Sequence, residues 1–130
     1  MINSHRVFRM QEVTFRGYVI IPDTDVRTFE VTPNSGPQDF DLSPEDKNVV
    51  IHSIYVSHSN AVAIKLTLEP VIGTPGKTLI FKGIFENGVR PVPFNPPIGA
   101  YRKGKVRLTV EGVGADQPVY VAIQYSFEGE

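Results

Sequence analysis

Residues 61–69 read AVAIKLTLE, and in this stretch apolar and polar side chains alternate with a period of two. That period is typical of a β-strand with one face in a core and the other in water. The same alternation returns in residues 106–111 (VRLTVE) and 119–127 (VYVAIQYSF). No window has the i, i+3, i+4, i+7 spacing of a long amphipathic helix. The pattern therefore predicts an all-β protein.

Three other segments are apolar on both faces, namely residues 13–21, 48–57 and 77–86. In residues 48–57, Val49, Ile51 and Tyr55 alternate with Val50, Ile54 and Val56. In a two-layer domain such strands need cover on the outer face. We expect a loop, an arm or a neighbouring subunit to supply it.

Proline and glycine, eleven of each, fall between the apolar runs. Residues 22–25, 73–76 and 112–118 are predicted turns, residues 33–41 a loop, and residues 91–99 (PVPFNPPIG) an edge segment or extended loop. Ser43 and Pro44 fit the N-cap and first position of one helical turn over 43–46. A further short strand is expected over 26–31.

The 130 residues predict one domain, a single antiparallel β-sandwich of the jelly-roll or Greek-key type. We expect seven or eight strands and at most one short helical turn, with residues 1–12 as a candidate extended N-terminal arm. An immunoglobulin-like sandwich is the alternative. It lacks support because the chain contains neither cysteine nor tryptophan.

The composition of the chain argues against several classes of function. Thirteen Lys and Arg against fourteen Asp and Glu leave a net charge of −1, so a protein that coats nucleic acid is not expected. The absence of cysteine excludes disulfides and thiolate chemistry. No apolar run is long enough to span a membrane, and the first residues lack the apolar core of a cleaved signal peptide. We expect no cofactor, no membrane partner and no secretion by a signal peptide.

The residues suited to catalysis or metal binding form no known motif. His52 and His58 share one predicted strand, about 20 Å apart at about 3.3 Å per residue, and pairing with backbone or water is expected for them. Asp39 and Asp41 lack the rest of an EF-hand pattern. There is no nucleophile elbow and no phosphate-binding loop. The protein is expected not to be an enzyme.

Several residues are candidates for an interface. Arg102, Lys103, Lys105 and Arg107 follow Tyr101 and form a basic cluster, with Arg90 nearby in the sequence. A solvated edge or salt bridges at a subunit boundary are preferred for this cluster over single-stranded nucleic acid. Phe40 and Phe94 stand alone in predicted loops; we expect Phe40 to fold back on its own domain and Phe94 to contact a partner. The predicted interface residues are Phe94, Tyr101, Arg102, Lys103, Phe40 and Arg90.

The second half of the chain carries a family resemblance. Residues 51–70 (IHSIYVSHSNAVAIKLTLEP), 77–85 (KTLIFKGIF) and 91–128 (PVPFNPPIGAYRKGKVRLTVEGVGADQPVYVAIQYSFE) give the order of the pattern. A strand ends in small polar residues, and a partner strand, an apolar hairpin and a proline-rich step follow before the last strands. Over about residues 48–128 this resembles small tailed-phage virion proteins of the head-decoration or auxiliary structural kind. Residues 1–47 depart from it.

The resemblance implies a non-enzymatic jelly-roll protein that assembles with itself, with a trimer favoured, and docks on a larger protein assembly such as a capsid or tail. It also implies a place in the virion, and otherwise the cytoplasm is expected. Two alternatives stay open. One is a carbohydrate- or ligand-binding sandwich of adhesin type that uses exposed tyrosines such as Tyr18, Tyr101 or Tyr120. The other is a cupin-type metal enzyme.

Overall fold

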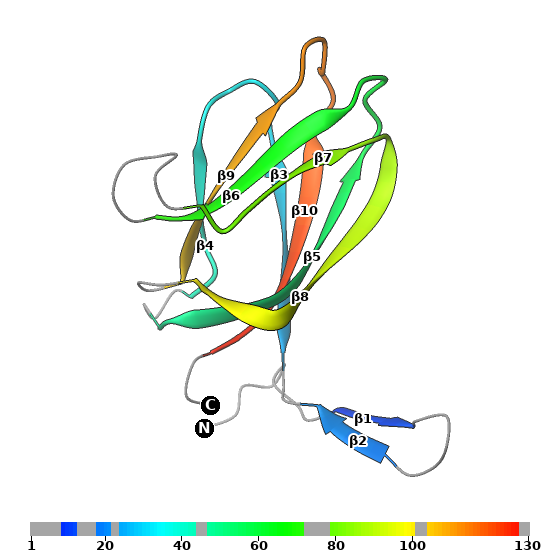
Figure 1. Cartoon of the computed structure of the whole chain (residues 1–130). Coiled ribbons are helices and arrows are strands. Elements are labelled where there is room, and N and C mark those ends of the chain that lie inside the picture. Colours follow the sequence, from blue (N-terminus) through cyan, green and yellow to red (C-terminus); the bar gives the residue numbers. More distant parts are fainter. Residues whose placement is uncertain are drawn as a thin grey trace.

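In the computed structural model, two four-stranded antiparallel sheets face each other (Figure 1). The structure describes residues 9–12, 18–21, 24–43, 47–71, 79–100 and 104–127. One sheet has the order β3-β10-β5-β8 and the other the order β4-β9-β6-β7. Their strands are β3 (Asp25–Val31), β4 (Gln38–Asp41), β5 (Val49–His58), β6 (Ile64–Pro70), β7 (Phe81–Phe85), β8 (Gly88–Ala100), β9 (Lys105–Glu111) and β10 (Val119–Phe127).

This strand order is that of a jelly roll: each strand lies in the opposite sheet from the next one along the chain, except that β6 and β7 are neighbours in one sheet. The predicted all-β sandwich is therefore confirmed, with eight strands in the two facing sheets and no helix among the described residues. The predicted strand over 26–31 is β3, and the turn at 112–118 joins β9 to β10. The proline-rich segment 91–99 lies in β8 at the edge of its sheet, as expected.

The core is formed by the facing sides of both sheets. Val121 and Ile123 of β10, Leu66 of β6 and Leu108 of β9 are all fully buried. In β10 burial alternates strictly along the strand, as the period of two predicts. In these regular strands, the apolar positions of the sequence are therefore the buried positions of the structure.

The structure of β5 differs from the expectation that residues 48–57 are apolar on both faces. Val49, Ile51, Ile54 and Val56 are all buried, although they fall on opposite sides of a simple period of two. A β-bulge explains this: Ser53 pairs with Gln124 and Ile51 with Tyr125, so His52 is an extra residue in β5. The bulge reverses the alternation, and most of the apolar side chains of β5 point inward. Val50 is half-buried, and only Tyr55 is exposed among the others.

The prediction of a loop over 33–41 was wrong for residues 38–41, which form β4. The polar sequence of this segment is typical of a loop, but it pairs with β9. Asp39 lies opposite Arg107 in the register, and the Arg107 Nε atom is 2.8 Å from Asp39 Oδ1. Phe40 points inward and its ring lies 4.6 Å from the ring of Phe29 on β3. These contacts close one side of the sandwich.

Several sequence predictions fall on residues outside the described ones. They include the turn at 73–76, residues 13–17, and positions 44–46 of the helical turn. Ser43 itself is described: its Oγ accepts a hydrogen bond from the Lys47 backbone N–H at 2.8 Å. Of the candidate arm, residues 9–12 form β1 (Arg9–Glu12), which pairs with β2 (Tyr18–Ile21) and with neither large sheet (Figure 1).

Candidate interaction surface

The outer sides of the two sheets differ in chemistry. On the β4-β9-β6-β7 sheet the outer side is charged, and three ion pairs join its strands β4, β9 and β6. Arg107 pairs with Asp39, Lys105 with Asp41 at 3.7 Å, and Lys65 with Glu111 at 3.5 Å. The hydrogen bond to Asp39 raises the pKa of Arg107. This face is a solvated ladder of ion pairs.

The outer side of the β3-β10-β5-β8 sheet carries hardly any charge. The strand register places one row of Thr28, Ala122, Tyr55 and Pro91 beside a second row of Glu30, Tyr120, Ser57 and Val89. Val26, Gln124 and Pro93 continue the face. We call this surface the tyrosine face; its members are Val26, Thr28, Ser57, Tyr55, Val89, Pro91, Pro93, Tyr120, Ala122 and Gln124. Glu30 lies on its outermost strand.

Large apolar side chains on the tyrosine face are open to solvent. Val26 is 54% exposed, Tyr55 45%, Val89 65% and Tyr120 42%. Tyr55 and Tyr120 are diagonal neighbours on adjacent strands, which brings two rings within reach of each other. Tyrosine enrichment with few charges is the composition of interface cores. The face is thus built like a surface that meets a partner.

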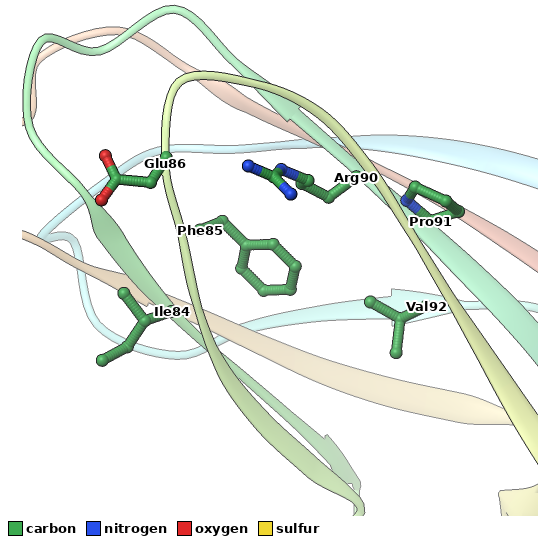
Figure 2. A pocket seen from close by; sticks show the side chains of 6 residues that line it. All are labelled: Ile84, Phe85, Glu86, Arg90, Pro91 and Val92. Carbon is green, nitrogen blue, oxygen red and sulfur yellow. The ribbon is translucent and has the colours of Figure 1, made fainter.

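A cleft of about 340 Å³ opens at another place, between the edges of β7 and β8. Phe85 and Val92 point toward each other across it, and the side chain of Arg90 also lines it (Figure 2). Ile84, Glu86 and Pro91 complete the lining. The predicted site residue Arg90 therefore lies in a cleft.

The other predicted interface residues are distributed as follows. Phe94 is half-buried, and its ring meets that of Phe81 edge-on at 5.7 Å, across the two sheets. Phe40 packs on Phe29, as expected for a residue that folds back on its own domain. Tyr101, Arg102 and Lys103 lie outside the described residues. Interface roles for all six residues stay predictions.

The two histidines of β5 have protein partners. His58 is buried; its Nε2 lies 2.9 Å from the carbonyl oxygen of Phe85, so this contact is with backbone, as predicted. For His52 the expected pairing with backbone or water was wrong: its Nε2 lies 2.8 Å from the side-chain hydroxyl oxygen of Ser126. Burial lowers the pKa of His52. Among the described residues, no three His, Asp or Glu side chains are grouped so that they could hold a metal ion. No helix in that part of the chain is long and apolar enough to cross a membrane.

The sequence pattern does not identify the tyrosine face as a surface. It presents Tyr120 as a candidate for stacking on a sugar and places Tyr55 on an apolar side of residues 48–57, together with Val49 and Ile51. The sequence does contain a sign of this face, because the outward positions of residues 119–127 and 53–57 carry almost no charge. Only the pairing of β5 with β10 shows that these positions form one surface.

Comparisons with known proteins add little. No family model matches the chain, and no curated protein matches it. One similar solved structure is the crystal structure of the Drosophila NLP core, reported for its insight into pentamer formation and histone binding. The two share 17% sequence identity with a TM-score of 0.44, and the match covers 78% of this chain and 97% of that one. A similarity of this size carries no inference about partners.

Proposed function

We propose that the protein is a non-enzymatic structural protein that self-associates and docks on a larger assembly, such as a phage capsid or tail. The observation that supports this most is the contrast between the two outer sheet faces. One carries paired charges, and the other carries exposed Tyr55, Tyr120 and Val89 with almost none.

The chemistry of the tyrosine face favours a second copy as its partner. A charged surface placed on it would lose hydration without gaining an ion pair, which is unfavourable. A partner surface therefore has to be nearly uncharged itself. Within the described residues, the outer sheet face that meets this demand is the tyrosine face of another copy. A contact between two tyrosine faces is isologous and closes with two copies, so the trimer implied by the resemblance, which stays part of the proposal, needs a heterologous contact as well.

The experiment is a concentration series in sedimentation velocity with Tyr55→Asp and Tyr120→Asp. Each substitution places a carboxylate in the proposed contact, and we expect it to shift the protein toward its 14.4 kDa monomer. Val113→Asp is the matched control, because Val113 is 97% exposed in the β9–β10 turn, away from the face. Unchanged association of both tyrosine variants would contradict the assignment of this face.

A second function is favoured by the same two rings. Exposed tyrosines flanked by neutral hydrogen-bonding groups such as Gln124 and Ser57 also suit stacking on a sugar ring. A carbohydrate-binding module would show a melting shift with a saccharide, and Tyr120→Ala would remove the shift. A glycan panel that gives no shift would eliminate this alternative.

A further inference from the structure

Strand β7 is an open sheet edge. It is the last strand in the order β4-β9-β6-β7, and its sequence FKGIF contains no proline. The neighbouring edge, β8, carries Pro91 and Pro93, which lack the N–H needed to extend a sheet. Of these two adjacent edges, only β7 can accept another strand without losing such donors.

The hydrogen bonds around β6 show which way the main chain of β7 points. The Val71 N–H donates to the Lys105 carbonyl on the β9 side, and the Ile80 N–H donates to the Leu68 carbonyl on the β7 side. Because main-chain groups alternate in direction along a strand, Leu66 and Leu68 face β7. Their register partners are Gly83 and Phe81. The main-chain groups of Lys82 and Ile84 therefore point away from the sheet, toward the open edge.

The side chains of the same alternate residues are exposed. Lys82, Ile84 and Glu86 are all open to solvent, whereas Phe85 between them is buried. Ile84 is 73% exposed, more than any other large apolar side chain in the strands of the two facing sheets. No hydrogen bond or ion pair joins Lys82 or Glu86 to another described residue. An apolar side chain thus lies midway between one unpaired cation and one unpaired anion.

This arrangement is complementary to itself. If two β7 strands pair antiparallel about a two-fold axis at Ile84, Ile84 lies opposite its own copy. Lys82 of each chain then lies opposite Glu86 of the other, which gives two cross-strand ion pairs. Moving the axis to Gly83 would place Lys82 opposite Ile84 and leave both charges without a partner. The charges therefore select one register.

We propose that β7 of one copy pairs antiparallel with β7 of a second copy, in the register that places Lys82 opposite Glu86. The contact joins two β4-β9-β6-β7 sheets into one continuous sheet and leaves the tyrosine face free. It is isologous and closes with two copies, so a trimer requires a different surface. This inference rests on the proposed self-association and names one surface that carries it.

The test is a charge exchange, read by sedimentation velocity over a concentration series. Lys82→Glu and Glu86→Lys each place like charges opposite one another twice, and we expect each to weaken dimerisation about tenfold or more. The double variant K82E/E86K restores two opposite-charge pairs, so its dimerisation is expected to return close to that of the wild type. Asp116→Lys is the control, because it reverses the charge of an exposed residue in the β9–β10 turn, which belongs neither to β7 nor to the tyrosine face.

Circular dichroism melting first shows that each variant is folded. Failure of the single variants to weaken association, or of the double variant to restore it, would overturn the β7 contact. If Tyr55→Asp dissociates the protein while the β7 variants do not, this inference fails and the proposed function stands. A wild-type chain that remains monomeric at all concentrations would overturn both.

Discussion

The His58 Nε2 atom lies 2.9 Å from the carbonyl oxygen of Phe85, which links the end of β5 in one sheet to the end of β7 in the other. The same ring accepts a hydrogen bond at Nδ1 from the Asn60 backbone N–H at 3.1 Å. With an acceptor at Nδ1, the proton of the neutral ring is on Nε2 and is donated to Phe85. One buried imidazole thereby joins both sheets at the end that carries the β7–β8 turn.

Asn60 extends this connection to the β9–β10 turn, and its removal tests the network. Its Oδ1 accepts from the backbone N–H groups of Asp116 and Gln117 at 2.9 and 2.7 Å, and its Nδ2 donates to the Gln117 carbonyl. Asn60→Ala leaves these groups without partners, and we expect a loss of about 2–4 kcal/mol in the free energy of unfolding. Urea unfolding measures it.

Asn87→Ala is the matched control for that loss, since Asn87 donates one hydrogen bond, to the Asn60 carbonyl at 3.2 Å. We expect it to cost about 1 kcal/mol. Equal losses for the two variants would show that Asn60 is not the centre of the network.

The extra residue in β5 gives a second prediction. Deleting His52 removes the bulge, and the alternation would then turn either Val49 and Ile51 or Ile54 and Val56 outward. Exposing two such side chains costs about 3–6 kcal/mol, enough to unfold a domain of ordinary stability. His52→Ala keeps the bulge and serves as the control. A deletion variant that melts at the temperature of His52→Ala would contradict the role assigned to the bulge.

His52 also predicts a pH dependence. Burial lowers its pKa in the folded protein, so as pH falls through about 6.5 the unfolded chain takes up a proton first. The free energy of unfolding should therefore decrease below about pH 6.5 and show no contribution from His52 above it. His52→Gln should lessen this decrease. The measurement is the difference between wild-type and variant urea midpoints from pH 5 to 8; a difference that does not change with pH would refute the prediction.

Substitutions at two glycines distinguish the cost of backbone strain from the cost of a steric clash. Gly104 and Gly36 both have positive φ, at 65° and 77°. A Cβ on Gly104 would lie 2.9 Å from the Lys47 carbonyl oxygen, whereas a Cβ on Gly36 would meet nothing within 4 Å. We expect Gly36→Ala to cost about 1 kcal/mol of stability, and Gly104→Ala to cost clearly more. Equal melting temperatures would show that the tight space around Gly104 can relax.

The sequence pattern predicts the regular strands well because their period is simple. In β10 and β9 every inward side chain is apolar, so position alone assigns each face. The sequence pattern fails to predict a strand where pairing with a neighbouring strand decides the structure. Three of residues 38–41 are polar, and the segment forms β4 where β9 places Arg107 opposite Asp39 and the ring of Phe40 packs on Phe29.

The apparent excess of apolar surface in β5 has a similar cause. A bulge inserts one residue, and a single sequence does not show whether an irregular alternation reflects two apolar faces or a change of phase. The opposite holds for β7, where Ile84 stays uncovered as the sequence suggested. The tyrosine face combines residues from four strands far apart in the chain, so its lack of charge appears only once their order is known.

Self-association is what the proposed function depends on, and the molar mass in solution measures it. Multi-angle light scattering coupled to size exclusion, from micromolar to near-millimolar concentration, should give a mass well above 14.4 kDa that falls toward this value on dilution. A mass of 14.4 kDa at every concentration would mean that the protein does not self-associate.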